Sequence, residues 1–307
     1  MKDLVKDTTK RNLGKRLHRC RLCGAEGRYD TYLVKEMMQD SGEEFEYFVC
    51  AECNCLQIAE IPQDLGKYYG KDYYSFAQEE LPDFHYETPV VRQDKILDVG
   101  CGSGAWLFGK VLSGYSNLHG CDPFLEKPLH YGDRVHIKNC SIHEIEGDAS
   151  FDVIRMKDSF EHMTDPIEVL QSAFRCLKPE GMLIMYIPVF PNAAFEMFGT
   201  YWFQIDAPRH IFLHSKKSLG YLEEKSGLKI VKMEYDASNA MIIRSFFYSM
   251  GVPFYEQSPE LISRFFTEED FRKMEKNIHS WNQAGYGDHV KIYWMHQDVY
   301  DIISDKI

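Results

Sequence analysis

A glycine-rich turn between a buried strand and a helix constrains the fold of this chain more than any other feature. Residues 96–104 read Ile-Leu-Asp-Val-Gly-Cys-Gly-Ser-Gly, and a helical stretch over residues 105–112 follows at once. The apolar residues of this run predict a buried strand, and its alternating glycines let the backbone turn sharply and approach a ligand closely. A strand, a glycine turn and a helix in this order predict a nucleotide-type binding site.

The acidic residue of this run, Asp98, indicates which kind of ligand binds there. A dinucleotide fingerprint has the spacing G-x-G-x-x-G and rests a pyrophosphate on the helix N-terminus. Here the spacing is D-x-G-x-G-x-G. A carboxylate at the tip of the strand repels a pyrophosphate and suits a ligand that carries an ammonium group. The spacing therefore disfavours a nicotinamide-dependent oxidoreductase.

A second acidic residue follows the next predicted strand. Residues 117–121 are strand-like, and Asp122 and Pro123 come directly after them. An acidic residue about twenty positions beyond the glycines accepts hydrogen bonds from the hydroxyls of a ribose. The alternative is a surface turn, because Asp-Pro is common in turns. The distance from the glycine turn favours the ribose site.

The elements that follow complete the pattern of a doubly wound α/β domain. Strand-like runs cover residues 135–138, 151–156 and 182–188, and a helical pattern covers residues 167–177. This order predicts a mostly parallel sheet. The glycine motif and the string FDVI…FEHMTDP…LKPEGMLIMYIP together resemble the class I S-adenosylmethionine-dependent methyltransferases, in the branch that acts on small molecules and sugars. The resemblance covers roughly residues 95–236.

The resemblance implies a Rossmann-like, seven-stranded, mostly parallel sheet with S-adenosylmethionine at its glycine turn. The turn holds the methionine end of the cofactor, whose amino group Asp98 serves, and Asp122 holds the ribose. An acidic residue often meets the adenine in this family, but Ser141 and Ile142 occupy that loop here. An aromatic segment before the glycine turn folds over the cofactor in similar enzymes. The implied cofactor-binding residues are Asp98, Gly100, Cys101, Gly102, Gly104, Asp122, Pro123, Ser141, Ile142, Lys157, Asp158, His162 and Tyr74.

Two C-x-x-C motifs near the N-terminus predict a metal site. The first consists of Cys20 and Cys23, and the second of Cys50 and Cys53. Four thiolates at this spacing close a tetrahedral zinc site without an open position, so its role is expected to be structural. The alternatives are ordinary cysteines in a reducing compartment, or disulfides. Short strand-like runs between the motifs indicate a zinc ribbon, and such ribbons also precede some sugar methyltransferases.

Transfer of a methyl group to a hydroxyl requires removal of a proton, for which a neutral histidine is well suited. The candidates are His162, His210 and His214. His210 follows the fifth predicted strand, on the side where open α/β sheets bind substrates, in a Pro-Arg-His segment that resembles one in sugar and small-molecule methyltransferases. We expect His210 to be the catalytic base, with Arg209 beside it for an anionic group such as a phosphate. The alternative is a hydrogen-bonded structural histidine before the helix that starts near Ser215.

Asp158, Glu161 and His162 form a second polar set near the expected cofactor site. Ubiquinone-type O-methyltransferases carry a similar segment, for which a divalent metal has been proposed. Two carboxylates and an imidazole are able to bind such an ion and to lower the pKa of an acceptor hydroxyl. We favour a supporting role through hydrogen bonds, because Mg²⁺ prefers ligands that are all oxygen.

The chain of 307 residues has room for one large domain and one small domain. We predict a zinc ribbon over residues 1–62, an aromatic linker or cofactor lid over residues 63–94, and a methyltransferase domain over residues 95–307. An aromatic and helical insertion over residues 237–288 either covers the substrate or forms a homodimer surface. The rings of the linker either cover the cofactor or pack the two domains together.

Charge and hydropathy exclude several classes of partner. The formal charge of −12 argues against nucleic acid, since phosphate binding needs a Lys/Arg surface. No apolar run has the length of a membrane span, and the N-terminus lacks the apolar core of a signal peptide. We therefore expect a cytoplasmic methyltransferase whose acceptor is a hydroxyl of a sugar, nucleotide sugar or polysaccharide precursor. The alternatives are an aromatic or quinone-type O-methyltransferase and a non-catalytic zinc-containing protein that binds the cofactor.

Overall fold

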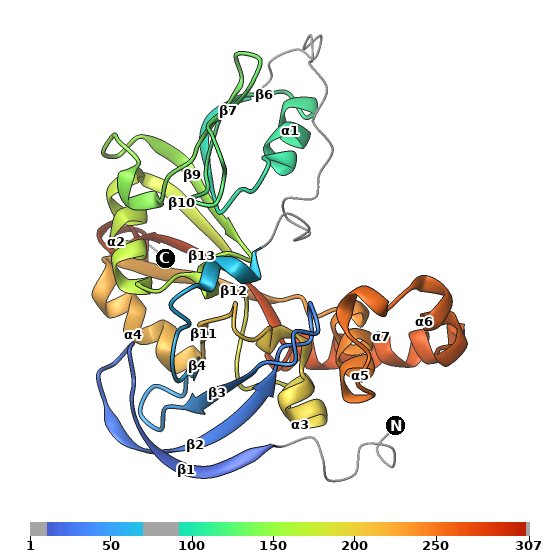
Figure 1. The fold of residues 1–307 in the computed structure, drawn as a ribbon. Helices are drawn as coiled ribbons and strands as arrows, with labels where there is room; N and C mark the ends of the chain where they lie inside the picture. Colours follow the sequence, from blue (N-terminus) through green and yellow to red (C-terminus); the bar gives the residue numbers. More distant parts are fainter. Residues whose placement is uncertain (1–10, 70–91, 305–307) are drawn as a thin grey trace. The chain divides into compact units, whose positions relative to one another are not determined.

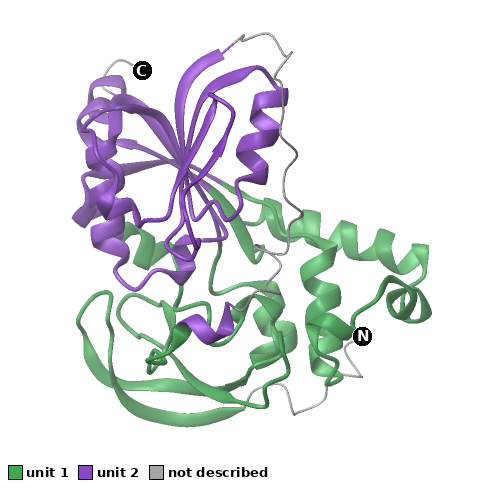
Figure 2. Ribbon diagram, turned by 45° about the horizontal axis from the view of Figure 1, so that its top comes forward, with its two compact units in different colours: residues 1–65, 188–221, 234–291 green, residues 66–187, 222–233, 292–307 purple. Residues whose placement is uncertain are grey.

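The computed structural model describes residues 11–69 and 92–304 and divides the chain into two compact units (Figure 1, Figure 2). Unit 1 consists of residues 1–65, 188–221 and 234–291, and unit 2 of residues 66–187, 222–233 and 292–307. The chain therefore passes repeatedly from one unit to the other. The segment 237–288, expected as an insertion of the methyltransferase domain, belongs to the same unit as the cysteine motifs.

Unit 2 is built on an eight-stranded sheet. The strands are β5 (Arg92–Val99), β6 (Tyr115–Cys121), β7 (Leu129–Tyr131), β8 (Val135–Lys138), β9 (Phe151–Lys157), β10 (Leu177–Pro188), β12 (Leu228–Tyr235) and β13 (His289–His296), and the helices are α1 (Ala105–Leu112), α2 (Pro166–Cys176) and α8 (Gln297–Ser304). The strand order is β12-β13-β10-β9-β5-β6-β8-β7. Because β5 pairs in parallel with β6 on one side and β9 on the other, the strand order reverses at β5. The predicted mostly parallel, doubly wound sheet is confirmed.

The sheet has one strand more than the seven predicted. The additional strand is β7, which pairs antiparallel with β8 at the end of the sheet order. Leu129 pairs with Ile137 and Tyr131 with Val135, so a short turn at Gly132 closes a hairpin. A strand of three residues gives too short a hydrophobic pattern to be found from sequence.

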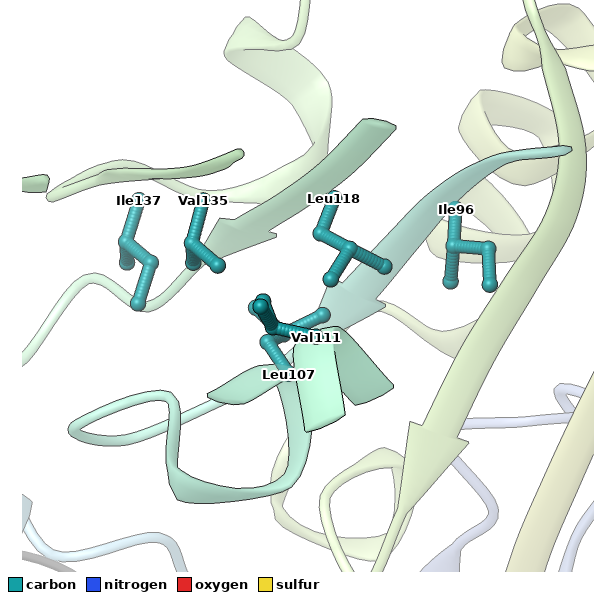
Figure 3. Packing of buried hydrophobic residues seen from close by; sticks show 6 residues of the cluster. All are labelled: Ile96, Leu107, Val111, Leu118, Val135 and Ile137. Carbon is teal, nitrogen blue, oxygen red and sulfur yellow. The ribbon is translucent and has the colours of Figure 1, made fainter. Parts of the chain in front are cut away.

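An apolar cluster holds α1 against the sheet directly after the glycine turn. Leu107 and Val111 of α1 pack against side chains from three neighbouring strands (Figure 3). The six buried members are Ile96, Leu107, Val111, Leu118, Val135 and Ile137. Burial of each such side chain contributes roughly 1.5–3 kcal/mol, so this cluster fixes the position of the glycine turn between β5 and α1.

Unit 1 contains a five-stranded sheet with the order β1-β2-β3-β4-β11. Its strands are β1 (Asn12–Arg19), β2 (Glu26–Lys35), β3 (Glu44–Val49), β4 (Leu56–Ile58) and β11 (Phe212–Leu213), and its helices are α3 (Ala193–Phe198), α5 (Asn239–Ser249), α6 (Pro259–Phe265) and α7 (Glu268–Gln283); α4 (Lys216–Ser226) begins in unit 1 and ends in unit 2. The predicted ribbon strands therefore gain a partner from far along the chain, because β11 pairs antiparallel with β4. In the described ranges, no helix is long and apolar enough to cross a membrane.

A buried ion-pair network joins the loop after β2 to the loop that precedes β11. The guanidinium of Arg209 is fully buried and donates to both carboxylate oxygens of Asp206, at 2.9 and 2.6 Å, and to Glu36 at 2.9 Å. Glu36 is also fully buried and accepts backbone N–H groups of its own loop. The expectation that Arg209 binds an anionic group of a ligand is not met, because its guanidinium is fully buried and paired with two buried carboxylates.

Replacement of Arg209 should therefore destabilise the fold strongly. We expect Arg209→Met to lower the free energy of unfolding by about 3–5 kcal/mol, because it leaves two buried carboxylates without their cation. The control is Arg272→Met, which removes an exposed pair with Glu268 on α7 and should cost less than about 0.5 kcal/mol. Urea unfolding of both variants measures the difference. Equal losses would contradict the role assigned to the buried network.

Candidate functional site

The predicted cofactor residues of unit 2 lie at the carboxyl ends of neighbouring strands. The glycine turn follows β5, Asp122 follows β6, Ser141 and Ile142 lie beyond β8, and Asp158 follows β9. These four strands are adjacent in the sheet, and the strand order reverses among them. Open α/β sheets bind ligands in the crevice at this edge, next to the reversal point. The structure thus brings together residues that are up to about sixty positions apart in the chain.

The glycine turn requires glycine for two physical reasons. The φ angles of Gly100, Gly102 and Gly104 are +72°, +53° and +83°, in the region that other residues rarely adopt. There is also no room for a side chain at two of these positions. A Cβ on Gly100 would lie 2.5 Å from the Cβ of Ser159, and a Cβ on Gly104 would lie 2.2 Å from Cδ1 of Ile137.

Backbone hydrogen bonds tie the glycine turn to the end of β6. The N–H groups of Gly100 and Cys101 donate to the carbonyl of Cys121 at 2.8 and 3.3 Å. The hydroxyl of Tyr131, on β7, donates to the carbonyl of Ser103 at 3.0 Å. The added edge strand therefore supports the glycine turn through a contact between residues that are distant in the chain.

Asp122 links two loops through its carboxylate. Oδ2 accepts the N–H of Gly102 at 2.9 Å, and Oδ1 accepts the N–H of Phe124 at 2.9 Å, so that Pro123 lies within the closed turn. Burial raises the pKa of Asp122, while the two amides lower it. A carboxylate oxygen can accept two hydrogen bonds, and each oxygen here retains capacity for a ribose hydroxyl.

The sequence predicts that the carboxylate of Asp98 binds the ammonium group of a ligand. In the structure this carboxylate already has a cationic partner within the protein. The side chain is buried, and Nη1 of Arg155 donates to its Oδ1 at 2.6 Å. Burial raises the pKa of Asp98 to about 6, although the guanidinium of Arg155 acts in the opposite direction. The guanidinium also lies over the ring of Trp106, 4.1 Å from its centroid. A ligand at this loop would therefore contact a carboxylate that is already paired with a guanidinium, not an isolated carboxylate.

Arg155 is a site residue that motif reasoning missed. It lies on β9 directly beside Asp98 in the parallel register. The available signal was a charged residue between the apolar residues Ile154 and Met156 of a predicted strand, since such a residue usually has a partner. Sequence spacing does not identify that partner, because the two residues belong to strands that are distant in the chain.

Ser141 and Ile142 form a capped turn in the loop after β8. The hydroxyl and the N–H of Ser141 both donate to Oε2 of Glu144, at 3.0 and 2.9 Å. Ile142 is buried. Their proposed contacts with the adenine remain a prediction.

His162 has an aromatic partner at the same edge of unit 2. Its Nδ1 lies 2.9 Å from the hydroxyl of Tyr69, whose ring stacks on Phe124 with centroids 4.8 Å apart. Tyr69 comes from the aromatic segment predicted as a lid, so one ring of that segment lies beside the turn that contains Asp122. Tyr74, the residue of this segment assigned to the cofactor, lies outside the described residues.

The structure does not bring Asp158 together with Glu161 and His162 as one set of metal ligands. Asp158 has a positive φ of 50° and pairs with Lys157 at 2.9 Å, on the surface of the unit. Glu161 is buried instead. Within the described part of the chain, Asp158 belongs to no group of three or more potential ligands that lie close together.

His210 is held in one orientation in unit 1. Its Nδ1 lies 2.8 Å from the carbonyl oxygen of Gln204, and its Nε2 lies 3.9 Å from Oδ2 of Asp206. Because a carbonyl oxygen only accepts, Nδ1 carries the hydrogen, and Nε2 is the acceptor atom of the neutral ring. The ring therefore presents Nε2 as its basic atom, with a carboxylate close enough to stabilise the protonated form.

The neighbouring candidate His214 is unsuited to proton transfer near neutral pH. It is fully buried, and burial lowers the pKa of its imidazole to about 3. Ser215 caps α4, because its hydroxyl accepts the N–H of Ser218 at 2.9 Å. His210 is thus the better candidate of the two.

The four predicted cysteine ligands form one cluster in unit 1. Their Sγ atoms all lie within 4.8 Å of one another, with Cys20 to Cys53 at 3.6 Å and Cys23 to Cys50 at 3.7 Å. Four sulfurs around zinc at 2.3 Å would be about 3.8 Å apart in a regular tetrahedron. The donor set and its spacing therefore fit zinc. The Sγ of the adjacent Cys55 turns away to the carbonyl of Leu213 at 3.4 Å.

Comparison with known proteins agrees with this geometry. The sequence profile described as "Methyltransferase domain" matches residues 69–233, which is more than half of the chain. The chain belongs to this family. The prediction of a methyltransferase of class I fold is thereby confirmed, whereas the acceptor is not identified by the match.

The relatives of this chain are named for different acceptors. Phosphoethanolamine N-methyltransferase 1 of Triticum aestivum is 27% identical over 66% of this chain and 41% of its own length. Ubiquinone biosynthesis O-methyltransferase of Dechloromonas aromatica (strain RCB) is 30% identical over 30% of this chain and 43% of its own length. The chain thus spans less than half the length of these two relatives. The crystal structure of geranyl diphosphate C-methyltransferase from Streptomyces coelicolor A3(2), in complex with Mg²⁺, geranyl diphosphate and S-adenosyl-L-homocysteine, has a TM-score of 0.43 and 13% identity, covering 69% of this chain and 75% of that chain.

The steric limits of the glycine turn give a direct prediction for ligand binding. We expect Gly100→Ala to weaken binding of S-adenosylhomocysteine at least about tenfold, because the new Cβ would displace Ser159 and strain a positive φ. The control is Gly109→Ala on α1, where no atom lies within 4 Å of an added Cβ and where alanine favours the helix. Calorimetric titration measures both variants. Unchanged affinity in Gly100→Ala would show that the turn does not contact this ligand.

Proposed function

We propose that this methyltransferase transfers the methyl group of S-adenosylmethionine to a hydroxyl of a small, sugar-type acceptor. The observation that most supports the proposal is the glycine turn, which Asp122 fixes at the carboxyl edge of the sheet through Gly102. Family membership supports the same cofactor. The sugar-type acceptor rests on the resemblance of the segment around His210.

The cofactor would be held by unit 2 in a defined direction. The remaining acceptor capacity of Asp122 suits the ribose hydroxyls, and the backbone of the glycine turn would receive the methionine end. Asp98 would receive the amino group while Arg155 limits the charge of the pair. When bound, the sulfonium supplies an activated methyl group, and the enzyme has to align it with the acceptor oxygen.

His210 would remove the proton of the acceptor. The hydroxyl proton would pass to Nε2 of His210, while the sulfonium of a bound cofactor would supply the methyl group that the acceptor oxygen gains. The Gln204 carbonyl retains the Nδ1 hydrogen, and Asp206 at 3.9 Å stabilises the resulting imidazolium. Both partners are in place before the proton moves, so no reorientation of the ring is required.

The cysteine cluster is proposed to bind one structural zinc ion. Cys20, Cys23, Cys50 and Cys53 would use all four tetrahedral positions, which leaves none for a substrate. The side-chain amide nitrogen (Nε2) of Gln57 donates to the sulfur of Cys20 at 3.1 Å, as expected next to a thiolate.

A cytoplasmic location and a homodimer remain predictions from the sequence.

An aromatic acceptor is the second candidate, and one observation favours it. Phe203, the residue before the Gln204 that holds His210, packs in a cluster with Tyr248, and its ring lies 5.7 Å from that of Phe254. The guanidinium of Arg244 lies 4.2 Å from the ring centroid of Phe254. Phe203 and Tyr248 are buried, so the ring of a quinol or catechol would have to stack on the partly exposed Phe254.

Replacement of His210 separates proton removal from cofactor binding. We expect His210→Gln to lower turnover about 10²–10⁴-fold, because general-base catalysis contributes a factor of this size, with unchanged affinity for S-adenosylhomocysteine. His279→Gln, at an exposed position on α7, is the control. Nucleotide sugars, glycans, catechols and quinols are first screened by mass spectrometry for a methyl gain. Near-normal turnover in His210→Gln would eliminate this residue as the base, and methylation of catechols alone would replace the sugar proposal.

A further inference from the structure

We infer that the cysteine cluster positions the catalytic base, because Tyr47 and the β4–β11 strand pair connect its ligand loops to the backbone of His210. The inference rests on the proposed roles of His210 and of the zinc site. It assigns Tyr47 as a positioning residue and makes bound metal a condition for the correct placement of the imidazole. All of the connecting contacts lie within unit 1.

The first connection runs through Tyr47 on β3. This side chain is fully buried, and its hydroxyl donates to the carbonyl oxygen of His210 at 2.8 Å. Two residues after Tyr47, β3 ends at Val49, and the ligand Cys50 follows. The N–H of Cys50 donates to the carbonyl of Cys55, which closes the second cysteine loop. A shift of that loop would therefore move the strand that fixes the backbone of His210.

The second connection runs through β4 and β11. The N–H of Ile58 donates to the carbonyl of Ile211, the residue after His210, at 3.1 Å. In the same strand pair, Gln57 lies opposite Phe212. The side chain of Gln57 is fully buried and donates to the Sγ of Cys20 at 3.1 Å. Gln57 thus contacts the sulfur of a predicted zinc ligand through its side chain. Its strand, β4, pairs with β11, which follows His210.

The third connection holds the C-terminal end of the segment that follows His210. The hydroxyl of Ser215 donates to the carbonyl of the ligand Cys53 at 2.6 Å. Ser215 also caps α4, so the cysteine loop and the start of the helix share one hydroxyl. The five residues that follow His210 are therefore held by both cysteine motifs, through Cys20 and through Cys53.

Loss of metal would act on His210 through these contacts and not through its ring partners. The Nδ1 bond to Gln204 and the approach to Asp206 come from the loop before His210, which Arg209 and Glu36 hold independently of the cysteines. Without metal, the four clustered thiols lose the ion that holds their loops. The carbonyl of His210 would then lose the fixed hydroxyl of Tyr47 as its donor. The direction of Nε2 would be determined only by the contacts of the ring and no longer also by those of the backbone.

The test compares Tyr47→Phe with Tyr32→Phe in zinc-loaded protein, and both with wild type after zinc removal by a chelator. Tyr32 is the matched control, because it lies directly opposite Tyr47 in the β2–β3 pair and its ring packs on Phe195. Hydrogen–deuterium exchange measures the exchange rates of the backbone amides of residues 207–214, and NMR of labelled histidine measures the signal of the His210 ring. Metal analysis and titration with S-adenosylhomocysteine are carried out on the same samples.

We expect zinc removal and Tyr47→Phe both to speed exchange over residues 207–214, the variant by about two- to tenfold, as the loss of one buried hydrogen bond implies. The His210 signal should shift or broaden in both, while zinc content stays at one equivalent in Tyr47→Phe and Tyr32→Phe behaves like wild type. Unchanged exchange and an unchanged His210 signal in either sample would overturn the inference, as would a chain that binds no zinc. Absence of S-adenosylhomocysteine binding would instead refute the proposed function, whatever the exchange shows.

Discussion

The proposed cofactor-binding edge of the sheet depends on two hydrogen bonds that the carboxylate of Asp122 accepts. Its two oxygens accept N–H groups from the glycine turn after β5 and from the turn after β6. The two loops belong to neighbouring parallel strands, so a single buried side chain sets their separation. Glycine adopts positive φ angles readily, and these contacts determine the path that the turn takes. The apolar cluster under α1 then fixes the helix that follows.

Local pattern was sufficient to predict most of this edge. The glycine spacing, the helix over residues 105–112 and the strand over residues 135–138 agree with the structure because each depends on residues next to one another in the chain. The positive φ angles of Gly100 and Gly104 also belong to this local pattern, whereas the close neighbours that exclude a side chain there, Ser159 and Ile137, are distant in the chain. The four cysteines were also found from spacing alone, since each motif forms its own turn.

What sequence could not supply depends on contacts between distant segments. The pair of Arg155 with Asp98 exists because β5 and β9 are neighbours, and the edge strand β7 is too short for a recognisable pattern. Arg209 looked like a ligand-binding arginine in a loop, and only the packing of the loop after β2 shows that Glu36 and Asp206 surround it. The addition of β11 to the ribbon sheet likewise has no local signal in two residues.

We propose above all that the glycine turn and Asp122 form a site for S-adenosylmethionine and not for a dinucleotide. The most direct measurement is calorimetric titration of the wild-type protein and Asp122→Ala with S-adenosylhomocysteine and with NADH. The account predicts saturable binding of one S-adenosylhomocysteine per chain, its loss in Asp122→Ala, and no binding of NADH. Binding of NADH, or S-adenosylhomocysteine binding that is unaffected by Asp122→Ala, would contradict it.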